Sequence, residues 1–398
     1  MTAAGARTVL TATAGQILEL VRSGEVTTRR ELQEQTGLSR STLTQRLAML
    51  TAAGYLSEAA ALHSGVAGRP AKGLSFVDTD KYVLTADLGA THARLALQDA
   101  AGAILAESTD RIRIQDGPDT VLSAVLDGFE ALLASAGAGA RERLCGIGIG
   151  VPGPVNVATK RLQQPPIMPG WDGHPVTAVF EERFGVPVLI DNDANLMGLG
   201  EARRYHPDVP SLLYVKVGTG IGAGLIIDGR PERGIAGGAG DIGHIRIAHP
   251  VAGAVCACGA NGCLAAHASG GALVRQLNDR GIPAETASDV ARLVQAGNAD
   301  AIALVRTAGQ LLGEVLATAV ALLNPGVLVI GGSMALTHEH FLIGVRESLY
   351  ERTVPLATRD LTVTASALRD RAAIEGARIM VVDHVFSAAA VDARLGAA

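Results

Sequence analysis

Gly240-Asp241-Ile242-Gly243-His244, followed by Cys256-Ala257-Cys258-Gly259-Ala260-Asn261-Gly262-Cys263, is the stretch around which the rest of the sequence is organised. One histidine and three cysteines stand there in the spacing His-x11-Cys-x-Cys-x4-Cys, and the intervening glycines let a short loop fold back on itself. Three thiolates and one imidazole are the ligand set of a closed, tetrahedral structural zinc site. We therefore predict that His244, Cys256, Cys258 and Cys263 bind zinc.

Two alternatives to zinc follow from the same residues. A disulfide cannot use all three clustered cysteines, and a Cys-x-Cys bridge is geometrically poor. A reduced, apolar loop would need no metal at all. If zinc is bound, the surroundings of His244 are held rigidly, and we expect a ligand pocket there.

Composition limits the class of protein. A chain of 398 residues is long enough for two or three domains. Its 48% hydrophobic and 18% charged residues indicate a compact protein rather than a disordered one. Only 3% of the residues are aromatic, which argues against stacking platforms for single-stranded nucleic acid.

Charge and cysteine usage indicate the compartment. The net charge of −5 excludes wholesale coating of nucleic acid but not one small DNA-binding module. Four cysteines, three of them in the proposed metal loop, suit a reducing cytoplasm. The sequence shows no signal peptide and no uncharged apolar run long enough to span a bilayer. We expect a soluble, cytoplasmic protein without a membrane partner.

Residues 1–78 have the pattern of a winged helix-turn-helix DNA-binding domain. A short amphipathic helix ends near Gly24, and the capping box Thr28-Arg29-Arg30-Glu31 begins a second helix. Ser39 can cap a third helix, whose apolar positions Leu43, Leu47 and Leu50 follow a helical spacing. The following segment to Phe76 reads as a hairpin that forms the wing.

The third helix is the expected reader of the major groove. The side chains predicted to contact DNA there are Arg40, Ser41, Thr42, Thr44, Gln45 and Arg46. Arg69, in the Gly-Arg-Pro at the tip of the hairpin, suits a narrow minor groove. Small three-helix modules also serve as protein docking units, which is the alternative. A steep salt dependence of duplex binding would favour DNA.

From about residue 81 the pattern changes to strands joined by glycine turns. The first turn follows Asp87 and contains Gly89 and Thr91, whose backbone amides and hydroxyl could lie against a phosphate. Asp87 could hold a water bound to Mg²⁺. A second turn contains Gly218, Thr219 and Gly220, and a third contains Gly331 and Gly332. This arrangement predicts two lobes that close on a nucleotide.

A buried strand between the lobes ends in Asp191-Asn192-Asp193-Ala194-Asn195. Polar side chains crowded after a strand are costly unless they bind something. Asp193 could accept a proton from a substrate hydroxyl, and Asn192 could donate and accept hydrogen bonds at a neighbouring one. The alternative is a capped turn before a helix over residues 196–204.

These stretches together resemble the ROK family of repressors, open reading frames and sugar kinases, within the hexokinase–actin-like ATPase superfamily. The motifs that carry the resemblance are DLGATHAR at 87–94, GIGIGVPGPV at 146–155, PGWDG at 169–173, DNDAN at 191–195, GTGIGAG at 218–224, GDIGH at 240–244, CACGANGC at 256–263 and NPGVLVIGGSM at 324–334. Their order and spacing run from about Thr79 past Met334. The resemblance implies an α/β fold, an actin-like ATPase domain of two lobes behind the winged helix.

The resemblance also implies roles for single residues. Asp193 matches the catalytic base, and Asn192, Asp241 and His244 match ligand contacts. The phosphate motifs correspond to residues 87–91 and 218–220, and the adenosine motif corresponds to Gly331 and Gly332. Trp171 looks like part of a loop that closes on a sugar, although packing is the commoner role of a lone tryptophan.

Three departures from the kinases of the family concern the sugar contacts. Asp241 stands where they carry Glu, Ala265 stands where they usually carry Glu, and His267 stands where Tyr is common. A lost carboxylate partner for a buried hydroxyl costs about 1–3 kcal/mol. Glucose-like ligands should therefore bind weakly, or the pocket should prefer another sugar, a sugar phosphate or an unrelated metabolite.

Two functions of different class remain. The first is a transcriptional regulator, a repressor in the simplest case, whose kinase-like domain senses a sugar or sugar-derived ligand and which binds an operator as a homodimer or a dimer of dimers. The second is an ATP-dependent sugar kinase that carries a DNA-binding domain and uses Mg-ATP. Either function fits the domains 1–78, 79–200 and 201–398, with a C-terminal helix that can return to the first lobe.

Overall fold

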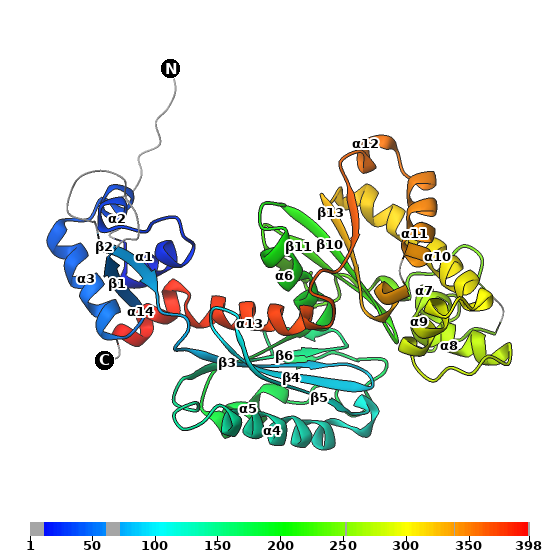
Figure 1. The fold of residues 1–398 in the computed structure, drawn as a ribbon, viewed down its shortest axis with the longest axis horizontal. Coiled ribbons are helices and arrows are strands. Elements are labelled where there is room, and N and C mark those ends of the chain that lie inside the picture. The colour runs from blue at the N-terminus through cyan, green and yellow to red at the C-terminus, as the bar shows by residue number, and fades with distance from the viewer. Residues whose placement is uncertain (1–11, 61–71, 251–252, 338, 397–398) are drawn as a thin grey trace.

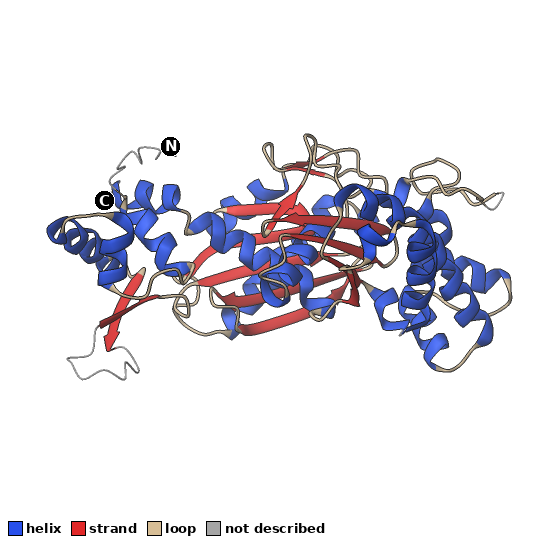
Figure 2. Cartoon of the chain, turned by 90° about the horizontal axis from the view of Figure 1, so that it is seen from above, coloured by secondary structure: helices blue, strands red, loops and turns tan. Residues whose placement is uncertain are grey.

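A computed structural model describes residues 12–60, 72–250, 253–337 and 339–396. The chain forms an elongated molecule with a small helical domain at one end and two β-sheets in the middle (Figures 1 and 2). A helical layer flanks the second sheet at the far end of the molecule (Figure 1). Both ends of the described part of the chain, near residues 12 and 396, lie at the end that holds the small domain (Figure 1).

The small domain is a winged helix. Its elements are α1 (Ala14–Arg22), α2 (Arg29–Thr36), α3 (Arg40–Ala52), β1 (Leu56–Ala60) and β2 (Lys72–Phe76). The predicted capping box begins α2, with the Thr28 hydroxyl and the Glu31 side chain each accepting a backbone N–H. Ser39 caps α3, and Leu43, Leu47 and Leu50 are buried as predicted. The strands β1 and β2 pair antiparallel and form the base of the wing.

The first lobe contains a five-stranded sheet in the order β5-β4-β3-β6-β9. Its elements are β3 (Tyr82–Leu88), β4 (His92–Asp99), β5 (Ile104–Arg111), α4 (Pro118–Ser135), β6 (Leu144–Val151), α5 (Val176–Phe184) and β9 (Val188–Asn192). The first three strands form antiparallel hairpins, and β6 and β9 continue the sheet in parallel. The short strands β7 (Val155–Asn156) and β8 (Arg161–Leu162) form a separate hairpin.

The second lobe repeats this order as β12-β11-β10-β13-β14. Its strands are β10 (Ser211–Val217), β11 (Ile221–Ile227), β12 (Arg230–Glu232), β13 (Val327–Gly331) and β14 (Thr362–Ala365). Its helices are α7 (Leu264–Ala268), α8 (Gly270–Asp279), α9 (Ala287–Gln295), α10 (Ala299–Leu323), α11 (Glu339–Arg352) and α12 (Pro355–Thr358).

Helix α10 is long and apolar enough to cross a membrane by length and composition alone. More than half of its most apolar window is buried in the structure, and its side chains belong to the core of the second lobe. It is therefore a core helix in this fold. In the described part of the chain, no other helix passes that test.

The two lobes exchange helices. Helix α6 (Asp193–Tyr205) leaves the first sheet and packs on β10 and β11 of the second, whereas α13 (Ala372–Val385) leaves the second sheet and packs on β3 and β6 of the first. Figure 1 shows α13 between α6 and the first sheet. The two helices meet closely, because a Cβ added at Gly376 would lie 1.8 Å from the Leu196 carbonyl oxygen.

The C-terminus completes the core of the winged helix. Helix α14 (Ala388–Gly396) packs on α1, and a Cβ added at Gly15 would lie 2.1 Å from the Ala388 carbonyl oxygen. Phe386 packs edge-on against Phe76, with 4.9 Å between ring centroids. Phe386 and Val391 are buried in the same apolar cluster as α1–α3. The core of the winged helix therefore combines side chains from α1–α3 with Phe386 and Val391, which lie more than 300 residues further along the chain.

Candidate functional site

The four predicted metal ligands converge in the loop between β12 and α7. The ligand atoms of His244, Cys256, Cys258 and Cys263 all lie within 4.8 Å of one another. The Cys258 and Cys263 sulfurs are 3.8 Å apart, and His244 Nδ1 lies 3.5 Å from the Cys256 sulfur. Tetrahedral zinc geometry places two sulfurs about 3.8 Å apart, and sulfur and nitrogen about 3.5 Å apart. The spacing fits a metal and is too long for a disulfide bond.

His244 joins this cluster to the region predicted to bind a ligand. Its Nδ1 faces Cys256, and its Nε2 lies 3.8 Å from Asp241 Oδ1. The imidazole therefore presents one nitrogen to the cysteines and the other to the exposed carboxylate of Asp241. Close packing supports the loop, since a Cβ at Gly240 would lie 2.0 Å from the Ala223 carbonyl oxygen on β11. A metal in the cluster would fix the direction of His244 Nε2.

Asp193 is buried at the first position of α6, where the partial positive charge of the helix end favours a carboxylate. The helix begins three residues earlier than predicted. The Lys216 ammonium, at the end of β10, donates a charge-assisted hydrogen bond to Asp193 Oδ2. Asp193 therefore faces a lysine from the other lobe.

Asn192 acts as the N-cap of α6. Its side-chain oxygen accepts from the backbone N–H groups of Ala194 and Asn195, at 2.9 and 3.4 Å, and its Nδ2 donates to the Gly153 carbonyl at 3.1 Å. Asn192 thus caps the helix, as the capped-turn alternative predicts. One Nδ2 hydrogen remains for a ligand.

Asp191 is fully buried but already paired. Arg233 Nε donates to its Oδ2 at 2.7 Å, and Asn195 Nδ2 donates to its Oδ1 at 3.0 Å. This pair joins the end of β9 to the loop that leads to Asp241. It closes one side of the site and leaves Asp191 without a free role in catalysis.

Asp87 is buried at the end of β3, and its Oδ1 has no hydrogen-bond partner among the described residues. Burial raises the pKa of Asp87, and Asp193 adds to the rise, while the positive charge of Lys216 opposes it. An unpartnered buried carboxylate oxygen is costly in a folded protein. It is the strongest sign that something binds here.

The predicted phosphate loops differ in the space around them. Gly220 has no atom within 4 Å of an added Cβ, and the nearest atom to one at Gly218 is 3.8 Å away, so a ligand can approach this backbone. Thr91 and Thr219 are exposed at the two turns. At Gly89, an added Cβ would meet the His92 ring at 2.3 Å, so this ring covers the first turn.

Internal packing explains the glycines of the third turn. An added Cβ at Gly331 would lie 1.8 Å from the Tyr214 hydroxyl oxygen, and one at Gly332 would lie 2.5 Å from the Val217 carbonyl oxygen. Gly332 also has a positive φ of 79°, which L side chains rarely adopt. Both glycines are required by the fold alone, so their adenosine-binding role stays a prediction.

Trp171 packs in the core of the first lobe. It is fully buried, and its Nε1 donates to the Ile114 carbonyl at 3.0 Å. The structure therefore agrees with the packing alternative for this residue, and its role in a closing loop stays a prediction. Its neighbour Asp172 is exposed instead and lines an open hollow between the lobes.

That hollow has a volume of about 500 Å³. Its lining residues are Pro154, Gln163, Gln164, Asp172, Ala236 and Gly238. The first four come from the loops after β6 and β8, and the last two precede Asp241. Polar side chains of the first lobe, Gln163, Gln164 and Asp172, therefore face the loop before Asp241 across a space large enough for a small, hydroxyl-rich molecule.

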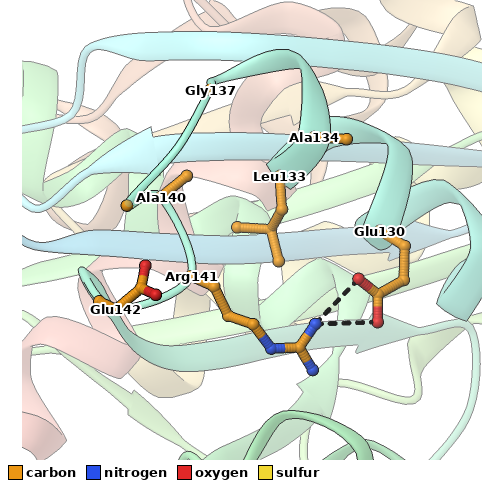
Figure 3. A pocket seen from close by; sticks show the side chains of 8 residues that line it. Glu130, Leu133, Ala134, Gly137, Ala140, Arg141 and Glu142 are labelled. Carbon is orange, nitrogen blue, oxygen red and sulfur yellow. Dashed lines mark hydrogen bonds and ion pairs between the residues drawn. The ribbon is translucent and has the colours of Figure 1, made fainter.

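A second hollow, of about 270 Å³, lies at the C-terminal end of α4 (Figure 3). Arg141 and Glu130 form an ion pair across it, with a shortest separation of 3.0 Å (Figure 3). None of the predicted site residues lines this hollow. Because Arg141 and Glu130 already pair with each other, we assign this hollow no ligand.

The predicted DNA-contacting side chains line α3. Arg40, Ser41, Thr44 and Gln45 are exposed, whereas Thr42 and Arg46 are half-buried. Thr42 is part of the helix cap, because its hydroxyl lies 2.9 Å from the Ser39 hydroxyl. Arg69 lies outside the described residues. The exposed group nevertheless presents hydrogen-bonding side chains along one helix.

Sequence reasoning missed Lys216 and Arg233. Lys216 is the single charge within the apolar strand β10, which is a recognisable signal, because a buried lysine needs a partner. Arg233 stands in a glycine-rich loop, where nothing in the sequence indicates its pairing with Asp191.

Comparison with known proteins identifies the family. Residues 83–384 match the model of the ROK family, and residues 10–57 match the model described as winged helix-turn-helix DNA-binding. The xylose repressor of Caldicellulosiruptor bescii is 29% identical over 389 residues, which cover 93% of this chain and 95% of the relative.

Two crystal structures are similar in fold. A ROK family transcriptional regulator described as a homologue of the E. coli MLC protein has a TM-score of 0.81 and 24% identity, with 97% of this chain and 98% of that chain covered. The ROK hexokinase from Thermus thermophilus has a TM-score of 0.62 and 31% identity, with 76% and 99% covered. The chain belongs to the ROK family and carries an N-terminal winged helix-turn-helix domain.

Proposed function

We propose that the protein is a DNA-binding transcriptional repressor whose ROK domain senses a sugar or sugar-derived ligand. The winged helix with an exposed α3 supports DNA binding. The similarity to a xylose repressor along nearly the whole chain supports repression and a carbohydrate ligand. The predicted sites lie at 192–193 and 241–244 for the ligand and on α3 for the operator.

One observation carries this proposal: continuous packing connects the ligand region to the DNA-binding domain. Asp193 begins α6, and α6 packs on α13, whose end shares its core with the winged helix. Asp383 on α13 accepts hydrogen bonds from Arg203 of α6 and from Arg22 of α1, at 2.9 and 2.7 Å. A ligand that binds one arrangement of the lobes better than another would therefore move the winged helix.

Zinc would serve as a structural metal in this sensor. The four donors of the cluster would form a closed shell and leave no open position for a substrate. The metal would hold His244 so that Nε2 points towards Asp241 and the ligand. We place zinc here because the donor set is three thiols and one imidazole at tetrahedral spacing.

The active form in this proposal is a cytoplasmic homodimer, or a dimer of dimers. Two copies would place two α3 helices about one DNA turn, or a multiple of it, apart on a near-palindromic operator. The thiol-rich metal loop suits a reducing compartment.

Genomic footprinting followed by operator titration tests the proposal. We expect one or a few near-palindromic sites, affinity that falls steeply with salt, and a shift of operator affinity by one member of a panel of pentoses, hexoses and sugar phosphates. The absence of any footprint would contradict DNA binding. An operator affinity that no sugar-type ligand changes would contradict sensing.

An ATP-dependent sugar kinase is the second candidate. It is favoured by the buried carboxylate of Asp193 and by the open backbone at Gly218 and Gly220. ADP release from Mg-ATP across a sugar panel tests it, with Asp193→Asn as the control. Release that depends on Asp193 would establish an enzyme, and release that survives the substitution would refute the role of Asp193.

A further inference from the structure

The two lobes place opposite charges at equivalent positions. Asp87 is the last residue but one of β3, and Lys216 is the last residue but one of β10. Each strand is the central one of its sheet and pairs antiparallel with one neighbour and parallel with the other. Each charged residue pairs in register with a glycine on the neighbouring parallel strand: Asp87 with Gly150, and Lys216 with Gly331. The repeat therefore brings an anion and a cation to the same cleft.

Lys216 is held as an ammonium ion by the carboxylates around it. It donates to Asp193 Oδ2, and its side chain is only 18% exposed. Burial lowers the pKa of Lys216, but Asp193 and Asp87 raise it, and the net result is a rise above the ordinary value. One cation thus pairs with Asp193 and also acts electrostatically on Asp87, the other carboxylate predicted to serve phosphoryl transfer.

A divalent metal ion would compete for this place. Mg²⁺ in nucleotide sites is bound by one or two carboxylates together with water and phosphate oxygens. Here Asp193 Oδ2 already accepts from the Lys216 ammonium, and the positive charge of Lys216 also opposes the rise in the pKa of Asp87. Placing two further positive charges beside a buried ammonium is electrostatically unfavourable. The residues present do not fit a Mg-nucleotide.

We propose that Lys216 is the resident cation of the cleft and takes the place of a divalent metal ion, so that the site binds its ligand without metal. This inference deepens the proposed sensor and rests on it. It also assigns Lys216 as the residue that separates this chain from a kinase. The unpartnered Asp87 oxygen then accepts a hydroxyl of an uncharged, hydroxyl-rich ligand rather than a metal-bound water.

Binding of Mn²⁺ to the zinc-loaded full chain tests the inference. Mn²⁺ takes the same oxygen ligands as Mg²⁺, and electron paramagnetic resonance counts the free ion directly. We expect the wild-type chain to show no stoichiometric Mn²⁺ site at millimolar concentration. A single wild-type site that disappears in Asp87→Asn would overturn the inference.

A variant that lacks the Lys216 ammonium should gain the Mn²⁺ site that the wild type lacks. Lys216→Met keeps the length of the apolar stem and leaves two buried carboxylates without a cation. We expect its Mn²⁺ affinity to rise at least tenfold over wild type and to be lost again in Lys216→Met/Asp87→Asn. A folded Lys216→Met with no gain in affinity would also overturn the inference.

Two further measurements keep the result interpretable. Lys216→Gln replaces the Met variant if circular dichroism shows that the latter is unfolded, with the same expectation. Operator binding is measured on each variant without Mn²⁺ or sugar. If the wild-type chain does not bind the operator, the proposed function is refuted and the Mn²⁺ result still stands. If the wild-type chain binds both the operator and Mn²⁺, only the role of Lys216 is refuted.

Discussion

The two five-stranded sheets share one order and one pattern of hairpins, yet they are put to different uses. The first sheet is covered by α13, which leads into the core of the winged helix. The second supports the cysteine loop and the long α10–α11 layer. The last residue but one is an aspartate in β3 and a lysine in β10. The two sheets thus share one topology and differ in the charged residues, loops and helices attached to their strands.

Substituting a cysteine of the second lobe's loop should have the largest effect on zinc content and on the unfolding midpoint, compared with a cysteine of the first sheet. Cys263→Ser should remove one equivalent of zinc and lower the unfolding midpoint by more than about 5 °C, because structural zinc contributes roughly 10–16 kcal/mol in small zinc domains. Zinc content by mass spectrometry and thermal unfolding measure this. Cys145→Ser, in β6 of the first sheet, is the matched control and should keep its zinc. Full zinc content in Cys263→Ser would contradict the site.

The crossing of α6 and α13 comes next. Gly376→Ala forces a methyl group against the Leu196 carbonyl and should cost about 1–3 kcal/mol of unfolding free energy. It should also reduce the ligand-induced change in operator affinity, measured by fluorescence anisotropy. Gly396→Ala in α14, where an added Cβ meets nothing within 4 Å, should be neutral or stabilising. Equal behaviour of the two variants would show that the crossing transmits nothing.

A third prediction is that a substitution in the winged helix changes DNA binding without changing the zinc content or the stability of the two lobes. Arg40→Ala should weaken operator binding and reduce the slope of log K against log salt by about 0.9, the effect of one lost phosphate contact. Zinc content and the unfolding midpoint should not change, since Arg40 is exposed. Arg359→Ala, an exposed change in the second lobe, is the control. An unchanged salt slope in Arg40→Ala would remove this residue from the DNA interface.

The smallest expected effect concerns the acid that ends β3. Because the pKa of Asp87 is raised in the folded chain, its contribution to stability is present below the unfolded value of 3.8 and is lost as the pH rises through the folded pKa. Asp87→Asn should therefore be the more stable protein once the pH has risen through the folded pKa of Asp87. Unfolding midpoints from pH 3.5 to pH 8, at about half-unit steps, measure the growing difference. Asp208→Asn, at an exposed position, should show none.

Local signals made much of the fold predictable. The caps at Thr28 and Ser39 and the helical spacing of Leu43, Leu47 and Leu50 depend only on neighbours in sequence, and the structure agrees with them. The cysteine spacing likewise brought its own ligands together.

Long-range packing was not predictable in the same way. A lone lysine in an apolar strand signals a partner without naming it, so the pairing of Lys216 with Asp193 could not be derived. Trp171 and Asn192 each had a ligand-binding and a structural interpretation, and only the surrounding packing favours the structural one. The exchange of α6 and α13 between lobes depends on contacts nearly two hundred positions apart.

The shared core of α1–α3 with Phe386 and Val391 has a consequence for synthesis of the protein. Domains generally fold in order as a chain leaves the ribosome. Here the winged helix, which precedes the ROK domain in the chain, lacks part of its interior until Phe386 and Val391 are translated. A product truncated within the ROK domain has an incomplete winged-helix core, so in the proposed repressor operator binding would require a complete ROK domain.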